Sequence, residues 1–231
     1  MSFRQPHKRP QPTPGWLTSK QTTRLLAALA LTVLIALVAG ITLALSHWRE
    51  PKAPELPPVL LSTVSGELPA NGLTPPQALA DALLSEQDRK ELRDPEACGR
   101  AIPGDGSLRH FWVSVALPPI RPDERLHFVR PALEPFCMWL YGAHTFSFDL
   151  VRERQTPQGL QYDVLHGSSA DIVTVHTTHH EGRYDITEAG CTANECNYRH
   201  QHWQQGEYRD VLCWREETEE GKTVRWEAMD C

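Results

Sequence analysis

The stretch Ile172–Thr187 reads IVTVHTTHHEGRYDIT. Apolar and polar residues alternate on both sides of Gly182, and a period of two is typical of half-buried strands. Glycine supplies the positive φ that a tight turn requires. The stretch therefore predicts two antiparallel strands, Ile172–Thr177 and Arg183–Thr187, joined by a short turn.

Alternating stretches of the same kind fill the rest of the C-terminal half of the chain. Glycines separate most of them, so short turns between successive strands are expected. The further predicted strands are Phe111–Leu117, Met138–Tyr141, Phe146–Arg152, Leu160–Leu165, Asn197–Trp203, Tyr208–Trp214 and Thr223–Ala228. Short consecutive strands predict an α+β fold that is mainly an antiparallel β meander or a small barrel.

One helix is expected before the strands. Thr74 can cap its N-terminus, Pro75 suits the first helical position, and Gln77 completes a capping box. An apolar stripe follows, formed by Ala78, Leu79, Ala82 and Leu83. We expect this single helix to pack on the core and to end before Pro95. The prolines between residues 120 and 145 predict short or irregular elements there.

The N-terminal part contains an uncharged apolar run, Leu25–Leu45, which reads LLAALALTVLIALVAGITLAL. A helix of about 20 residues spans the hydrocarbon core of a bilayer. A cleaved signal peptide has a shorter apolar region of about 7 to 15 residues. The run therefore predicts a single transmembrane helix over residues 25–45 that acts as a signal anchor.

Charges on either side of this run predict its orientation. Five Lys and Arg residues and no acidic residue precede it, whereas the basic and acidic residues just after it balance. Basic flanks stay in the cytoplasm, so residues 1–24 are expected to form a disordered cytoplasmic tail. No Asn in the rest of the chain is followed two positions later by Ser or Thr. We therefore expect the bacterial inner membrane, with the C-terminal part in the periplasm.

The exported part begins with a proline-rich segment. Pro51, Pro54, Pro57 and Pro58 predict a stiff linker over residues 46–72, and residues 73–231 are expected to form the exported domain. Without the five basic residues of the tail, 18 Lys and Arg face 29 Asp and Glu, a formal charge of −11. This charge repels phosphate backbones, so no nucleic-acid partner is expected.

All six cysteines follow the apolar run. An even number of cysteines in an oxidising compartment predicts disulfides, and six allow 15 connectivities. The cysteines are Cys98, Cys137, Cys191, Cys196, Cys213 and Cys231. Proximity in the sequence and strand geometry favour the pairs Cys98–Cys137, Cys191–Cys196 and Cys213–Cys231.

Several groups capable of metal chemistry occur in residues 196–207, which read CNYRHQHWQQGE. Side chains alternate along a strand, so His200 and His202 project from the same face. Imidazole and carboxylate ligands suit Zn, Fe or Ni. With His176 at the end of an earlier strand, and with Glu207, they form a candidate metal site.

The histidines also have simpler interpretations. A polar strand face exposed to water carries imidazoles without any ligand, and clustered imidazoles that titrate near neutrality suit a pH sensor. The sequence contains no G-x-S-x-G, H-E-x-x-H, C-x-x-C, P-loop or G-x-G-x-x-G motif. We therefore expect a binding protein rather than an enzyme, and no cofactor.

Small residues recur at every fourth position of the apolar run: Ala28, Thr32, Ala36, Gly40 and Ala44. Such a stripe lets a second helix approach closely. It predicts a homodimer, or contact with the membrane helix of a partner, although the high content of Ala, Gly and Thr also produces such a stripe by chance.

These patterns together predict a membrane-anchored envelope protein whose exported domain binds a partner protein or an exported ligand, in assembly, inhibition or immunity. The residues expected to make this contact are Tyr198, His200, His202, Trp203 and Tyr208. The alternative is a membrane-tethered periplasmic metalloenzyme that uses the histidine-rich site.

Overall fold

The computed structural model describes residues 29–41, 52–94, 96, 98, 102, 104 and 106–231. Residues 29–41 are helical and exposed within their unit, Met1–Glu50, which is separate from the unit Pro51–Cys231. In the part of the chain that the structure describes, no helix has the length and hydropathy needed to cross a membrane. The predicted tail 1–24 and both ends of the predicted membrane helix lie outside the described residues.

The second unit contains a six-stranded antiparallel sheet in the order β1-β6-β7-β8-β9-β10. Five consecutive strands make it a meander with β1 added at one edge. The strands are β1 (Val59–Val64), β6 (Ile172–His180), β7 (Arg183–Cys191), β8 (Glu195–Gln204), β9 (Glu207–Glu219) and β10 (Lys222–Met229).

A second antiparallel sheet has four strands in the order β2-β3-β4-β5. Its strands are β2 (Trp112–Ala116), β3 (Glu124–Pro131), β4 (Phe146–Thr156) and β5 (Gly159–Ala170). The helices of this unit are α2 (Gln77–Leu83) and α3 (Glu86–Arg93), with the 3-10 turns η2 (Leu108–Phe111) and η3 (Met138–Leu140).

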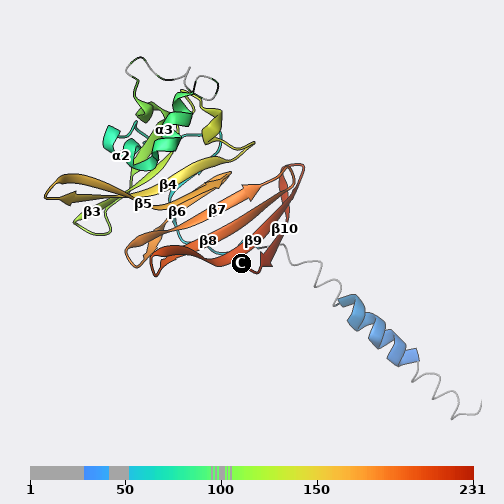
Figure 1. Ribbon diagram of the computed structural model, residues 1–231. Coiled ribbons are helices and arrows are strands. Elements are labelled where there is room, and N and C mark those ends of the chain that lie inside the picture. The colour runs from blue at the N-terminus through green and yellow to red at the C-terminus, as the bar shows by residue number, and fades with distance from the viewer. Residues whose placement is uncertain are drawn as a thin grey trace, which may run out of the picture. The chain divides into compact units, whose positions relative to one another are not determined.

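The four-stranded sheet lies between the helices and the six-stranded sheet (Figure 1). On one face, Leu79 of α2 and Leu92 of α3 pack with Val129 and Val151. On the other face, aromatic and aliphatic side chains of the two sheets meet. Burial of apolar surface on both faces of the middle sheet therefore holds three layers together.

The hairpin predicted from the opening stretch is confirmed. Glu181 and Gly182 connect β6 to β7 with φ angles of 48° and 77°. Two consecutive positive φ angles are the signature of the two-residue turn that fits the twist of a β-hairpin, and glycine adopts them without steric cost. Seven strands were predicted between residues 146 and 228 and one at 111–117, and all eight are present.

β1 lies within the range predicted as a linker. Its sequence follows four prolines, and pairing with β6 incorporates it into the sheet. The turn after β1 is held by Arg130 of β3, which is 0% exposed. Its guanidinium donates to Thr63 Oγ1 at 2.6 Å, to the carbonyl of Val64 at 2.7 Å and to that of Ser65 at 2.8 Å. The folded unit therefore begins well before residue 73.

The predicted α+β fold is confirmed, and of the two predicted arrangements, a meander or a small barrel, the described strands β6 to β10 form the meander. Two details are corrected, because two helices, α2 and α3, take the place of the single packing helix and one predicted strand is absent. The second helix starts because Ser85 Oγ accepts from Asp88 N while the Asp88 carboxylate accepts from Ser85 N, a capping box. The segment at 138–140 is a 3-10 turn, not a strand.

No strand was predicted over residues 124–131, yet β3 is an inner strand of its sheet. It ends at Pro131, and its last six residues are all buried. Because both faces of this strand are covered, its sequence lacks the alternation that marks a half-buried strand.

All three predicted disulfides are confirmed: Cys98–Cys137, Cys191–Cys196 and Cys213–Cys231. The first ties the segment after α3 to the segment before η3, and the second closes the β7–β8 hairpin. The third attaches the C-terminal residue to β9.

Candidate metal centre

Three ligand groups come together on the face of the six-stranded sheet that points away from the other sheet. Tyr184 and Ile186 of β7 pack in the core between the sheets, so the intervening Asp185 projects from the opposite face. The antiparallel register that pairs Ile186 with Gln201 places Asp185 beside His202 of β8. His180 at the end of β6 completes the set.

We call His180, Asp185 and His202 the carboxylate–histidine cluster. His180 Nδ1 lies 2.6 Å from Asp185 Oδ1, and His202 Nε2 lies 3.9 Å from Asp185 Oδ2. One ligand atom from each residue can be chosen so that all three lie within 4.8 Å of one another. The imidazole rings are stacked, with centroids 3.6 Å apart and an angle of 14° between their planes.

Among the described residues no arginine or lysine forms an ion pair with Asp185. Asp185 is 1% exposed, and within the same residues its Oδ2 has no hydrogen-bond partner. Its ion-pair contacts there are the two histidines alone. Burial lowers the pKa of His202, an effect that outweighs the attraction of Asp185. A buried carboxylate oxygen without a partner is costly in a protein interior.

The donor set suits a divalent transition metal. Two imidazole nitrogens and a carboxylate oxygen are ligands for zinc and for ferrous iron. Bonds of about 2.0–2.2 Å would bring the ligand atoms to roughly 3.4 Å from one another. Small rotations of the two histidines, whose side chains are 45% and 23% exposed, would achieve this.

The other two histidines of the predicted metal set have a different role. His176 is 0% exposed and His200 is 5% exposed, and Thr187 lies between them. We call His176 and His200, which are joined by Thr187, the closed histidine pair. His176 Nε2 lies 2.8 Å and His200 Nδ1 lies 3.0 Å from Thr187 Oγ1.

Hydrogen bonds occupy nitrogens of both rings. His176 Nδ1 lies 3.0 Å from the carbonyl of Pro57, which only accepts, so Nδ1 carries a proton. Nε2 of the same ring and Nδ1 of His200 both form a hydrogen bond with the Thr187 hydroxyl. Burial lowers the pKa of His200 to about 4, so the His200 ring is neutral at pH 7. The three nitrogens in these bonds are therefore already engaged.

Glu207, the fourth residue of the predicted metal set, is not brought to the histidines. It begins β9 opposite Gln204 and pairs with Arg209 at 2.8 Å. The sequence thus identified one ligand of the cluster, His202, and missed two. The available signals were the run of histidines at the end of β6, which includes His180, and the carboxylate of Asp185 between the apolar residues Tyr184 and Ile186 of β7.

The five residues predicted to contact a partner make internal contacts. Tyr198 stacks on Trp214 with centroids 5.0 Å apart and donates to Glu216 at 2.8 Å. Trp203 packs edge-on against Tyr208, whose hydroxyl donates to the carbonyl of Tyr184 at 2.8 Å. His200 belongs to the closed pair and His202 to the carboxylate–histidine cluster. Their role in contacting a partner stays a prediction.

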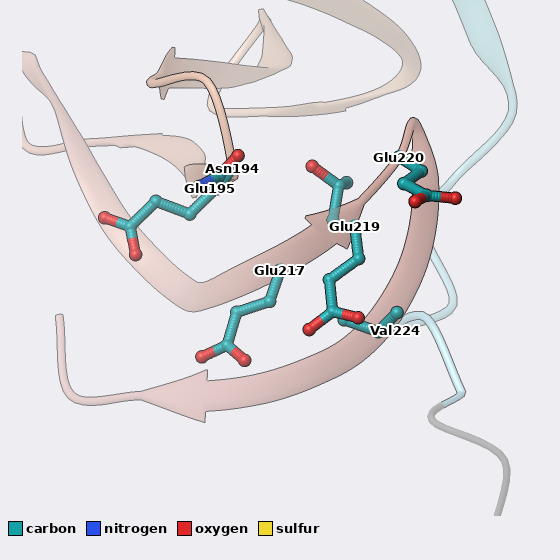
Figure 2. A pocket seen from close by; sticks show the side chains of 7 residues that line it. Asn194, Glu195, Glu217, Glu219, Glu220 and Val224 are labelled. Carbon is teal, nitrogen blue, oxygen red and sulfur yellow. The ribbon is translucent and has the colours of Figure 1, made fainter.

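A separate acidic hollow of about 510 Å³ lies beside the β9–β10 hairpin. Figure 2 shows Glu195, Glu217 and Glu219 among the side chains that line it. Arg215 and Arg225 lie 3.8 and 4.0 Å from two of these side chains. Exposed carboxylates of this kind are well solvated, so we assign no ligand to them.

Comparison of the chain with protein-family models, with curated proteins and with solved structures finds no match. The functional argument therefore depends on the chemistry of the residues themselves.

Proposed function

We propose that this chain is a membrane-anchored, exported protein whose C-terminal domain binds a divalent transition-metal ion at the carboxylate–histidine cluster. One observation carries the proposal. Asp185 is buried, and its Oδ2 has no hydrogen-bond partner among the described residues, while two imidazoles lie beside it. A bound cation would supply both the missing countercharge and the missing partner.

The protonation state also favours a metal. Metal ligands must be deprotonated, and a neutral imidazole is ready to bind without first releasing a proton. Burial lowers the pKa of His202, which keeps this ligand neutral at pH 7. Three protein ligands leave at least one coordination position of the ion open to water or to a group from another molecule.

A metalloenzyme is the competing function, because catalytic zinc also has three protein ligands. A hydrolase needs in addition a cavity that holds the substrate next to the ion. The acidic hollow at β9–β10 is lined by other residues. We therefore favour a binding protein, in which the ion stabilises the outer face of the sheet or contacts a partner.

The proposed location is the bacterial inner membrane, with residues 25–45 as the anchor and the folded unit in the periplasm. Three disulfides support an oxidising compartment. A C-terminal alkaline phosphatase fusion is expected to be active, because that enzyme needs export. An inactive fusion, together with a bright cytosolic reporter at the same position, would refute the proposed topology.

The metal proposal is tested on the purified full-length chain in detergent. After dialysis against Zn²⁺ or Co²⁺, elemental analysis is expected to find one ion per chain, and Co²⁺ is expected to give a visible absorption band. Each of His180→Ala, Asp185→Asn and His202→Ala should weaken binding by about 100-fold or more, since loss of even an outer partner costs about 10- to 100-fold.

His179→Ala is the matched control. His179 is an exposed histidine next to His180 on the same strand, and its removal should leave the affinity unchanged. Wild-type protein without a stoichiometric ion would refute the proposal. Equal weakening by His179→Ala would show that the ion binds elsewhere.

A further inference from the structure

The edge of β2 presents an unpaired piece of backbone. Leu117 N donates to the carbonyl of Leu126 at 2.8 Å, so the odd-numbered residues of this segment direct their backbone N–H and C=O groups toward β3. Ser114 faces the outer edge, where it exchanges hydrogen bonds of 2.8 and 3.0 Å with Leu73. Ala116, two residues further on, must direct its N–H and C=O to the same edge.

No segment of the described residues covers Ala116. The chain that pairs with Ser114 turns away at Gly72, whose N–H donates to the carbonyl of Pro69 at 3.0 Å. Ala116 is exposed although it belongs to a strand. An exposed strand edge of this kind is a template for a further strand.

A cavity opens on each face of the strand at this edge. The first, of about 530 Å³, lies on the helix side and includes Arg109 and His127. The second, of about 420 Å³, lies toward the six-stranded sheet and includes Leu60, Leu61 and Leu117. Both include Asn71, Val115 and Ala116. Each is large enough to hold a ligand group.

One residue that lines the helix-side cavity, His127, has a ring nitrogen without a partner among the described residues. His127 is 6% exposed, and its Nε2 lies 3.0 Å from Glu153, a carboxylate that also accepts from Tyr162 at 3.2 Å. A carboxylate only accepts, so Nε2 carries the proton, and burial lowers the pKa of this ring. Nδ1 is then a buried acceptor with no donor among the described residues.

The same cavity carries a positive charge. Arg109 belongs to η2 and lines this cavity, and no acidic side chain of the described part of the chain pairs with its guanidinium. A carboxylate is the group that a guanidinium binds with the best geometry. The opposite cavity has no charged residue in its lining, which is mainly aliphatic and includes two polar residues, Ser62 and Asn71.

We propose that an extended peptide segment of a partner protein adds to the edge of β2 at Ala116. Successive side chains of a strand point to opposite faces, so the segment would send polar side chains into the helix-side cavity and apolar ones into the other. An acidic side chain pairs with Arg109, and a hydroxyl or amide of the segment donates to His127 Nδ1. This site is independent of the metal centre and goes beyond the proposed metal binding.

The test uses a labelled probe, acetyl-Leu-Glu-Leu-Thr-Leu-amide, whose binding to the full-length chain in detergent is followed by fluorescence anisotropy. Its Glu and Thr lie on one side and its Leu residues on the other. Arg109→Gln should weaken binding about tenfold, because a hydrogen bond to a charged group is lost. Ala70→Trp, at an exposed residue of the sheet-side cavity, should block that cavity and weaken binding to a similar extent.

Two controls decide the outcome. A peptide of the same composition in the order Leu-Leu-Leu-Glu-Thr lacks the alternation, and Arg225→Gln removes an exposed arginine of β10. The proposal requires weaker binding of the reordered peptide and no effect of Arg225→Gln. It is overturned if the two peptides bind equally, or if Arg225→Gln weakens binding as much as Arg109→Gln. Unchanged melting temperatures would show that the variants fold.

Discussion

Two buried carboxylates on β7 lie three positions apart and face opposite sides of the sheet. Glu188 is 2% exposed and faces the four-stranded sheet, and Asp185 is 1% exposed and faces outward. Glu188 accepts hydrogen bonds from His166 at 2.8 Å, Ser168 at 3.0 Å and Arg199 at 2.9 Å. Asp185 contacts two histidines, one of them at 3.9 Å, and forms no ion pair with any arginine or lysine of the described residues.

This difference indicates which of the two carboxylates, Glu188 or Asp185, stabilises the fold. Burial alone would raise the pKa of Glu188, but the hydrogen bond and charge of His166, with Ser168 and Arg199, hold it below its usual value. Glu188 is therefore ionised and compensated, and it joins the two sheets. Asp185 is equally buried without such compensation, so its carboxylate is available to a cation from outside.

Removal of the Glu188 carboxylate should have the largest effect. Glu188→Ala leaves His166, Ser168 and Arg199 without their shared partner at the junction of the sheets. Loss of one member of a buried ion pair costs about 3 kcal/mol, measured here as the free energy of unfolding in urea. Glu207→Ala, which removes an exposed carboxylate paired with Arg209, should cost less than about 1 kcal/mol. Equal losses would mean that Glu188 does not join the sheets.

A third carboxylate, Asp149 of β4, should give a smaller and pH-dependent effect. Burial raises its pKa to about 6, which outweighs the attraction of His166. A carboxyl whose pKa is higher in the folded state stabilises the fold at low pH, and this contribution is lost as the pH rises from about 4 through 6. We expect wild type to lose about 2 kcal/mol relative to Asp149→Asn over this range.

The measurement compares urea unfolding of the two proteins at pH 4, 5, 6 and 7. Other titrating groups are common to both, so their contributions cancel in the difference. Parallel stability curves would show that Asp149 keeps an ordinary pKa in the folded state.

Asp185→Asn should give the smallest effect, and it should have the opposite sign to Glu188→Ala. With a chelator present, removal of an uncompensated buried charge should stabilise the fold by about 1 kcal/mol. Asp123→Asn, at an exposed residue, serves as the control and should change the free energy of unfolding by less than about 0.5 kcal/mol. If Asp185→Asn lowers the free energy of unfolding as much as Glu188→Ala does, the proposed difference between the two carboxylates is wrong.

Added Zn²⁺ gives a further test of the difference between Asp185 and the other buried carboxylates. A ligand that binds the folded state alone stabilises it, so wild type should melt at a higher temperature with Zn²⁺ than with chelator. Asp185→Asn should show no such rise, whereas Asp149→Asn should respond like wild type.

The predicted strands show where sequence reasoning succeeds. Strands whose sequences alternate in polarity, such as β7, β8 and β9, were found at nearly the right residues. β3 was missed because helices cover one face and the six-stranded sheet covers the other, which removes the alternation. β1 was missed because its place in the sheet depends on pairing with β6, more than one hundred residues later.

The sequence by itself determined the antiparallel strands, their tight turns, the three disulfide pairs and the grouping of histidines along β6 and β8. These features depend on residues close to one another in the chain or on a period of two. Only the tertiary structure decided which histidines belong to the closed histidine pair and which to the carboxylate–histidine cluster. Pro57 and Thr187 form hydrogen bonds with His176 and His200, whereas in the part of the chain that the structure describes Asp185 Oδ2 has no hydrogen-bond partner. Hydrogen-bond saturation is a property of contacts between strands, which the polarity pattern of one strand does not contain.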